Sequence, residues 1–154
     1  MDSKKHDLLF VDESSFHSWL GKDKAWSIDD QTIEVPLNKK QHRITCFGAI
    51  GCALKGNMCV ELFTTTNGAN FRKFLPLLKA NLRNQYSNKK VYLCIDNHAG
   101  HRSKESIKVM EQLGFVPLWL PSYSSYFNSV EYLWSLLKCN FRKLLCREKT
   151  NLTY

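Results

Sequence analysis

The order of short apolar runs along the chain is the feature that most constrains its fold. Three stretches rich in β-branched and aromatic residues come first, and two more alternate with stretches whose apolar residues recur at helical spacing. The predicted strands cover residues 8–12, 43–54, 58–65, 91–96 and 115–120, and the predicted helices cover residues 70–85, 103–113 and 129–146. The order β-β-β-α-β-α-β-α predicts an α/β fold with a mixed five-stranded sheet flanked by helices.

Turn-forming residues separate these elements. Lys55-Gly56-Asn57 predicts a hairpin turn, so the second and third strands should pair antiparallel. Residues 19–38 are rich in turn-forming residues and predict a loop with short hairpin pieces. Pro76 falls inside the first helical stretch, where it either starts or kinks the helix.

Length and composition exclude several classes of protein. The 154 residues fit one domain, and 44% apolar content is typical of a folded chain. No apolar run approaches the roughly 18 residues of a membrane helix, and the apolar run near Met1 is too short for a signal peptide. The six cysteines contain no Cys-x-x-Cys pair, so neither a disulfide framework nor a zinc site is expected. We expect an intracellular protein with no membrane partner.

The formal net charge of +8 is unevenly distributed. Residues 68–95 contain no acidic residue but several basic ones, and the last helical stretch adds a second basic cluster. Such a distribution suits a polyanionic partner, because contacts to phosphates dominate affinity for nucleic acids. It equally suits a solubilising surface, and charge alone does not separate the two.

Three carboxylates have settings that favour catalysis. Asp12 and Asp96 each end a predicted buried strand, and Glu131 lies in the first turn of the last predicted helix. If the first and fourth strands lie parallel and adjacent, their carboxyl ends bring the two aspartates together, where ligands gather in α/β sheets. Hard oxygen ligands favour Mg²⁺ or Mn²⁺. Two such ions about 3.5–4 Å apart can promote in-line phosphoryl transfer, with water as the nucleophile to cut DNA or a 3′-hydroxyl to join it.

Each acidic residue also has a purely structural interpretation. Asp12 is compatible with a turn at a strand end, and so is Asp96. Asn128 followed three residues later by Glu131 resembles a capping box, in which the glutamate only closes the start of a helix. The combination of all three, in this order, favours the catalytic interpretation.

Other polar residues near these positions leave two alternatives open. Glu131, Ser135, Lys138 and Arg142 form one stripe at helical spacing, which either follows a phosphate backbone or is a solvated face. His98 and His101 flank the turn after Asp96; they either position a phosphate or a metal-bound water, or cap and pack locally.

Three motifs resemble the catalytic domain of DDE transposases of the mariner superfamily and its bacterial insertion-sequence relatives. They are residues 10–14 (FVDES), residues 96–103 (DNHAGHRS), and residues 121–128 together with residues 131–134 (EYLW). The 34 residues between Asp96 and Glu131 are a spacing characteristic of that superfamily. The resemblance covers nearly the whole chain.

This resemblance implies an RNase H-like fold and DNA cleavage and strand transfer that depend on two Mg²⁺ or Mn²⁺ ions. Asp12 (not Glu13), Asp96 and Glu131 correspond to the metal ligands and catalytic residues, and Asn97 and His101 to auxiliary motif positions. The expected partners are transposon ends and target DNA, with a homodimer or higher assembly in the active state. The expected location is at DNA, in the nucleus of a eukaryote or the cytoplasm of a bacterium. The expected DNA contacts are Arg102, Lys138 and Arg142.

The chain departs from the family pattern in two respects. Ser125 and Ser129 stand where the family usually has proline, and a proline at a helix start would pre-organise the helix that carries Glu131. The chain also begins almost at its first strand, so we expect one catalytic domain over residues 1–154, without N-terminal helix-turn-helix domains. Sequence-specific recognition of transposon ends should then be absent or supplied by a separate DNA-binding chain.

The sequence is also compatible with two alternative functions. One is a stand-alone RNase H-like nuclease, against which the spacing and the motif around Trp134 argue. The other is a catalytically inactive or domesticated remnant that still binds DNA.

Overall fold

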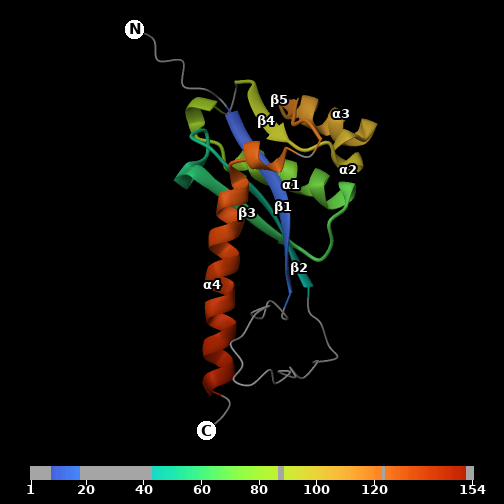
Figure 1. Ribbon diagram of the computed structural model, residues 1–154. Coiled ribbons are helices and arrows are strands. Elements are labelled where there is room, and N and C mark those ends of the chain that lie inside the picture. Colours follow the sequence, from blue (N-terminus) through green and yellow to red (C-terminus); the bar gives the residue numbers. More distant parts are fainter. Residues whose placement is uncertain (1–7, 18–42, 87–88, 123, 152–154) are drawn as a thin grey trace.

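Five strands form one mixed sheet in the computed structural model, which describes residues 8–17, 43–86, 89–122 and 124–151 (Figure 1). The strands are β1 Leu8–His17, β2 Arg43–Ile50, β3 Met58–Phe63, β4 Val91–Ile95 and β5 Phe115–Trp119, in the sheet order β3-β2-β1-β4-β5. β2 pairs antiparallel with β1 and with β3, whereas β4 pairs parallel with β1 and with β5. The predicted mixed sheet, with the first and fourth strands adjacent and parallel, is confirmed.

The helices follow the predicted order with one addition. They are α1 Gly68–Ala80, α2 Ala99–Arg102, α3 Lys104–Gln112 and α4 Val130–Asn151, and the 3₁₀ turns are η1 Lys55–Asn57, η2 Asn84–Tyr86 and η3 Ser125–Phe127. Ser103 opens α3 as expected, its hydroxyl accepting a hydrogen bond from the Ser106 N–H. The short α2 just before it was not predicted. Pro76 lies inside α1 without ending it. The loop predicted for residues 19–38 falls outside the described residues.

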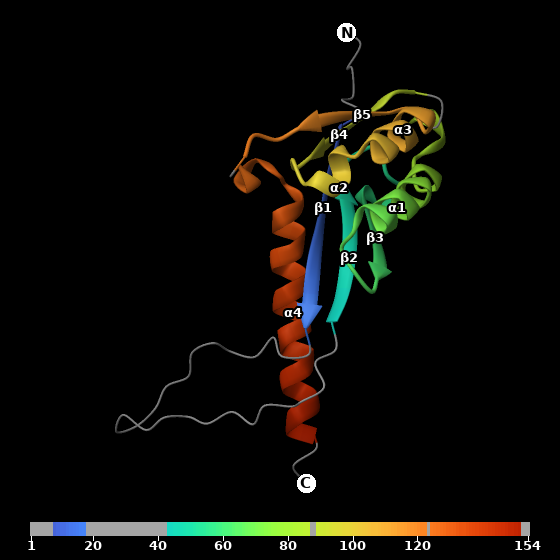
Figure 2. The same cartoon turned by 90° about the vertical axis from the view of Figure 1, so that its right-hand side faces the viewer.

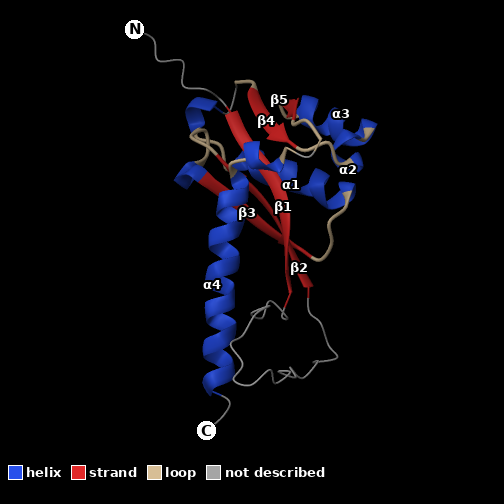
Figure 3. Ribbon diagram, in the orientation of Figure 1, coloured by secondary structure: helices blue, strands red, loops and turns tan. Residues whose placement is uncertain are grey.

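Helices cover both faces of the sheet (Figures 2 and 3). α1 and α3 pack on one face, where Phe71, Leu75 and Met110 join Leu9 and Val11 in the larger core cluster. α4 packs on the other face, in a smaller cluster whose buried members are Phe16, Cys46, Val130, Leu133 and Trp134. None of the helices in the described part of the chain is long and apolar enough to cross a membrane.

β1 is longer than predicted, which changes the position of Asp12. The strand continues to His17 because β2 pairs with it as far as His17↔Arg43. Asp12 therefore lies inside β1, not at its carboxyl end, and the prediction of a strand end there was wrong. The pairing of β1 with β4, however, stops at Phe10↔Cys94. Asp12 and Asp96 each lie two residues beyond that last pair, so they reach the same level of the sheet.

Candidate active site

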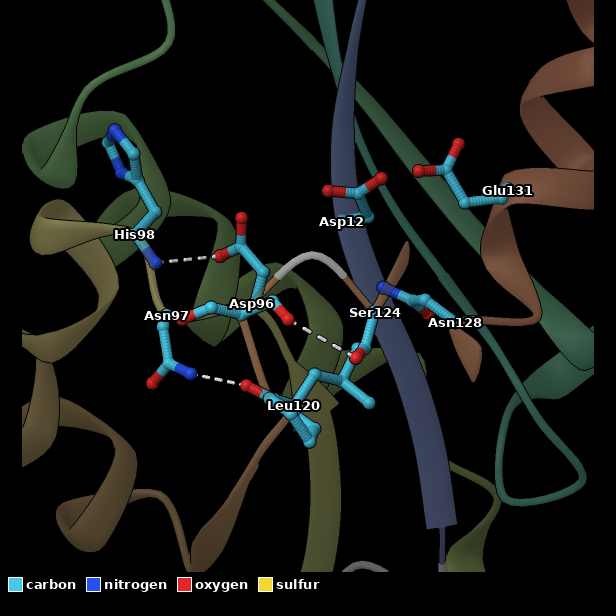
Figure 4. Close-up of a pocket in the computed structure, with 10 residues that line it drawn as sticks. Asp12, Asp96, Asn97, His98, Leu120, Ser124, Asn128 and Glu131 are labelled. Carbon is cyan, nitrogen blue, oxygen red and sulfur yellow. Dashed lines mark hydrogen bonds between the residues drawn. The ribbon is translucent and has the colours of Figure 1, made fainter. Parts of the chain in front are cut away.

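A pocket of about 270 Å³ opens where β4 ends, between that strand and the start of α4 (Figure 4). Its lining includes Asp12 from β1, Asp96 just after β4, and Glu131 from the first turn of α4. The fold thus brings together the three carboxylates that are far apart in the sequence. Asn97 and His98 also line the pocket.

Alternation along β1 separates Asp12 from its neighbour Glu13. Successive side chains of a strand point to opposite faces of the sheet. Asp12 accordingly contacts Trp134 of α4, whereas Glu13 contacts His101 of α2 on the other side. Asp12 lines the pocket and Glu13 does not.

Asp96 is held by two donors from the segment that follows it. Its Oδ1 accepts hydrogen bonds from the His98 backbone N–H at 3.0 Å and from His101 Nδ1 at 2.7 Å. The hydrogen bond from His101, more than the opposing effect of burial, lowers the pKa of Asp96 below its ordinary value. Asp96 is therefore ionised at neutral pH.

His101 is a buried cation between two carboxylates. It is 3% exposed, packs on the ring of Phe71, and places Nε2 3.3 Å from Glu13 Oε2 while Nδ1 faces Asp96. Burial lowers its pKa, but the contacts with Asp96 and Glu13 outweigh burial and raise the pKa of His101 to about 9. His101 thus packs behind Asp96 instead of lining the pocket. Glu13 was not predicted as the second partner of His101, although the alternation of side chains along β1 was a signal for it.

Asp12 has the opposite electrostatic environment. Burial raises its pKa from 3.8 to about 7, with further contributions from the charges of Glu13 and Glu131, and hydrogen bonds from the Glu13 backbone and Trp134 offset only part of this. Trp134 Nε1 donates to Asp12 Oδ2 at 3.1 Å. Among the described residues, no lysine or arginine forms an ion pair with Asp12. A carboxylate in this position is best stabilised by a bound cation.

The start of α4 is tied to β1 by Asn128. Its Nδ2 donates to the Val11 carbonyl at 3.1 Å, and its Oδ1 is buried with no hydrogen-bond partner in the described structure. The capping-box interpretation fails, because the side-chain oxygen of Asn128 does not accept the N–H of Glu131; that N–H reaches the Asn128 backbone carbonyl instead. Glu131 is exposed at the pocket, and Ser129 immediately precedes the first helical residue.

The auxiliary residues take different positions. Asn97 bridges the ends of two strands, its Nδ2 donating to the Leu120 carbonyl and its Oδ1 accepting from Arg102. His98 accepts a hydrogen bond from the Gly100 N–H, which caps α2. Arg102 lies over the ring of Trp119. Of the expected DNA contacts, neither Arg102 nor the α4 pair Lys138 and Arg142 lines the pocket.

Glu13, His98 and His101 form a second group of metal-ligand atoms, all within 4.8 Å of one another. Both ring nitrogens of His101 already face carboxylates, however: Nδ1 forms a hydrogen bond with Asp96, and Nε2 forms an ion pair with Glu13. The all-oxygen set of Asp12, Asp96 and Glu131 is the one suited to Mg²⁺ or Mn²⁺.

Known proteins resemble the chain in both sequence and fold. The family described as DDE superfamily endonuclease matches residues 7–153. The insertion element IS630 uncharacterized 39 kDa protein of Shigella sonnei is 28% identical over 138 residues, which cover 88% of this chain and 38% of that protein.

Among solved structures, the Mos1 transposase paired-end complex with the left transposon end has a TM-score of 0.70 at 19% identity, covering 90% of this chain and 43% of that one. The catalytic domain of Mos1 mariner transposase has a TM-score of 0.57 at 19% identity, covering 88% and 60%. These matches confirm the expected RNase H-like fold. The chain spans less than half the length of the first relatives it matches.

Proposed function

Because the chain belongs to the DDE superfamily of endonucleases, we propose that it is the catalytic domain of a transposase, which cuts DNA and joins the resulting 3′ ends to target DNA. The observation that carries the proposal is the single pocket shared by Asp12, Asp96 and Glu131. The structural neighbours also support the proposal, because they include a Mos1 strand transfer complex.

The donor set of the pocket fits divalent metal ions. Three carboxylates line it, and one of them, Asp12, has a pKa raised to about 7 by burial and by nearby negative charge. Asn128 also lines the pocket, and its buried Oδ1 lacks a hydrogen-bond partner among the described residues, which is costly unless a ligand or water supplies one. Mos1 complexes with Mg and with Mn are among the similar structures. We propose two Mg²⁺ or Mn²⁺ ions as cofactors.

In the proposed reaction, Asp12, Asp96 and Glu131 would hold these ions. When bound, the ions supply Lewis acidity for an in-line attack on a DNA phosphodiester and for the departing oxygen. His101 keeps Asp96 ionised and oriented through the 2.7 Å hydrogen bond. Asn97 joins the ends of β4 and β5, so it keeps the floor of the pocket in place. Asn97 and His101 are therefore positioning residues.

DNA is the proposed partner, inside the cell, as transposon ends and as target. Arg102, Lys138 and Arg142 are the proposed phosphate contacts; Arg142 is exposed and Lys138 half-buried along the α4 stripe that begins at Glu131. We propose that recognition of transposon ends comes from a region beyond these residues or from a separate chain, and that the active form is a dimer or higher assembly.

The first experiment is Mn²⁺-dependent nicking of supercoiled plasmid. We expect the wild type to nick DNA, and Asp96→Ala and Glu131→Gln to lose about 100-fold or more of this activity, because the ions supply several kcal/mol of transition-state stabilisation. Glu105→Gln is the matched control, since Glu105 also lies in the first turn of a helix but outside the pocket. Equal activity of the wild type and Asp96→Ala would refute the catalytic role.

The second experiment separates joining from cutting. A duplex with a free 3′-hydroxyl end is incubated with plasmid and Mn²⁺, and covalent joining is measured on a denaturing gel. Joined product supports a transposase, whereas hydrolysis of DNA or of RNA–DNA hybrids without joining identifies a stand-alone nuclease.

The third experiment tests the phosphate contacts through the salt dependence of DNA affinity. Arg142→Ala should reduce the slope of log K against log salt by about 1, because one phosphate contact is lost. Lys143→Ala is the control, since Lys143 is the next residue of α4 and is also exposed, but points about 100° around the helix. A slope for Arg142→Ala equal to that of the wild type would remove Arg142 from the interface.

A further inference from the structure

Asp12 has a direct cross-strand neighbour without a side chain. In the β1–β2 register, Asp12 is paired with Gly48. Residues directly opposite each other in an antiparallel pair present their side chains on the same face, only about 5 Å apart. Any other residue at position 48 would therefore place its side chain beside the Asp12 carboxylate.

The indole of Trp134 fills the space that Gly48 leaves open. A Cβ atom added at Gly48 would lie 2.5 Å from Cη2 and 2.8 Å from Cζ2 of Trp134, distances that require something to move. Trp134 itself is 2% exposed and belongs to the cluster between α4 and the sheet. The ring thus rests directly on the backbone of β2, next to Asp12.

This placement directs the one polar atom of the indole at the carboxylate. Nε1 donates to Asp12 Oδ2 at 3.1 Å, and an indole has a single N–H and no acceptor. The hydrogen bond therefore engages one carboxylate oxygen and leaves Oδ1 for the pocket. Trp134 is also three residues after Glu131 on α4, so the same contact sets the distance between the helix that carries Glu131 and the strand that carries Asp12.

We propose that Trp134 is a positioning residue that orients Asp12 and places Glu131 beside it, and that Gly48 is required because it makes room for the indole. The inference rests on the proposed function, since it needs Asp12 and Glu131 to be ligands. It accounts for an ordered start of α4 without the prolines of the resembled family: Trp134 and Asn128 both anchor that helix to β1. If Trp134 were only a core residue, its N–H would contribute nothing to metal binding.

The test is Mn²⁺ affinity of the DNA-free protein, measured by electron paramagnetic resonance on variants whose folding is verified by circular dichroism. Trp134→Phe keeps an aromatic ring but removes the N–H, and we expect it to weaken Mn²⁺ binding by roughly tenfold or more, as loss of a group that orients a ligand does. Gly48→Ala should weaken binding in the same direction by displacing the ring.

Two controls match these changes outside the site. Trp119→Phe alters a tryptophan of β5, and Gly56→Ala adds a methyl group at a positive φ of 71° with no atom within 4 Å. Gly56→Ala should lower stability, because an L side chain is strained there. Both controls should bind Mn²⁺ like the wild type, which separates positioning from general destabilisation.

The outcomes distinguish this inference from the function on which it rests. Loss of Mn²⁺ binding in Asp12→Asn with wild-type binding in Trp134→Phe overturns the positioning role and leaves the proposed function intact. Wild-type binding in Asp12→Asn overturns the ligand assignment, and the inference with it.

A measurement on the wild type covers the case in which neither variant folds. The chain has four tryptophans, so the indole N–H resonance of Trp134 is assigned as the one that persists in each of Trp19→Phe, Trp26→Phe and Trp119→Phe. It should shift when Mg²⁺ is added, while that of Trp119 stays in place. A Trp134 resonance that does not respond to saturating Mg²⁺ overturns the inference.

Discussion

The two aspartates of the pocket reach the same level of the sheet but have opposite electrostatic environments. Asp96 accepts two hydrogen bonds, one of them from the buried His101, and its pKa is lowered. Asp12 is buried near Glu13 and Glu131, and its pKa is raised to about 7. The only ion pairs within the described residues are those of His101 with Asp96 and Glu13.

The difference indicates where the site lacks positive charge. His101 neutralises the side of the pocket around Asp96, whereas the Asp12 side has only the neutral N–H of Trp134 and backbone donors. A cation bound in the pocket would relieve the burial of Asp12 and its repulsion by Glu131 together. Metal-free stability should therefore respond in opposite directions to changes on the two sides.

The largest effect should come from His101. His101→Gln removes the cation between Asp96 and Glu13 and leaves buried carboxylate uncompensated, so we expect a loss of roughly 3 kcal/mol in the free energy of unfolding at pH 7. Urea denaturation measures it. His98→Gln, three residues earlier and exposed, should change stability by less than about 0.5 kcal/mol. Similar losses in the two variants would contradict the role of His101 as the cation that pairs with Asp96 and Glu13.

Replacing each aspartate should reveal the contrast directly. Asp12→Asn should stabilise the metal-free protein by on the order of 2 kcal/mol at pH 8, because it removes a charge whose burial is unfavourable. Asp96→Asn should destabilise it by about 1–2 kcal/mol, because it breaks the pair with His101. Thermal unfolding in EDTA compares the two. Changes of the same sign would show that the two environments are alike.

The pH dependence of stability should show the same contrast between the two sides of the pocket. The folded protein retains the Asp12 proton up to about pH 7, whereas an unfolded chain loses it near pH 3.8. The contribution of Asp12 to stability is therefore present at low pH and is lost as the pH rises from 3.8 to about 7. The contribution of His101 is present below 6.5 and is lost as the pH rises through about 9. Melting temperatures measured from pH 4 to 10 test this. Asp12→Asn should remove only the loss of stability that occurs as the pH rises to about 7. A profile identical to that of the wild type would contradict the raised pKa of Asp12.

The smallest effect on stability should come from Glu131. It is exposed at the pocket, so Glu131→Gln should change the free energy of unfolding by less than about 0.5 kcal/mol without metal. The same variant should lose the stabilisation that Mn²⁺ gives the wild type, since a ligand stabilises only the state that binds it. A variant that Mn²⁺ still stabilises fully would exclude Glu131 as a ligand.

Sequence patterns predicted most of the architecture because they depend on local chemistry. Apolar periodicity located the five strands and the three longer helices, and the order of elements implied the parallel neighbours β1 and β4. Boundaries were less accurate: β1 continues past Asp12 because its partner β2 continues, and such a partner is not visible within the run itself. The short α2 escaped detection because four residues carry no periodicity.

The sequence by itself identified Asp12, Asp96 and Glu131 as candidates, because acidic residues after buried runs and at a helix start are recognisable one at a time. The tertiary structure alone decided what surrounds each of them. Glu13 faces His101 and Asp12 faces Trp134 because β1 alternates and helices cover both faces. Gly48 lies opposite Asp12 on the adjacent strand β2 and admits the indole because it has no side chain. Charge and burial at a site depend on residues distant in the chain, so the opposite pKa shifts of the two aspartates follow from packing.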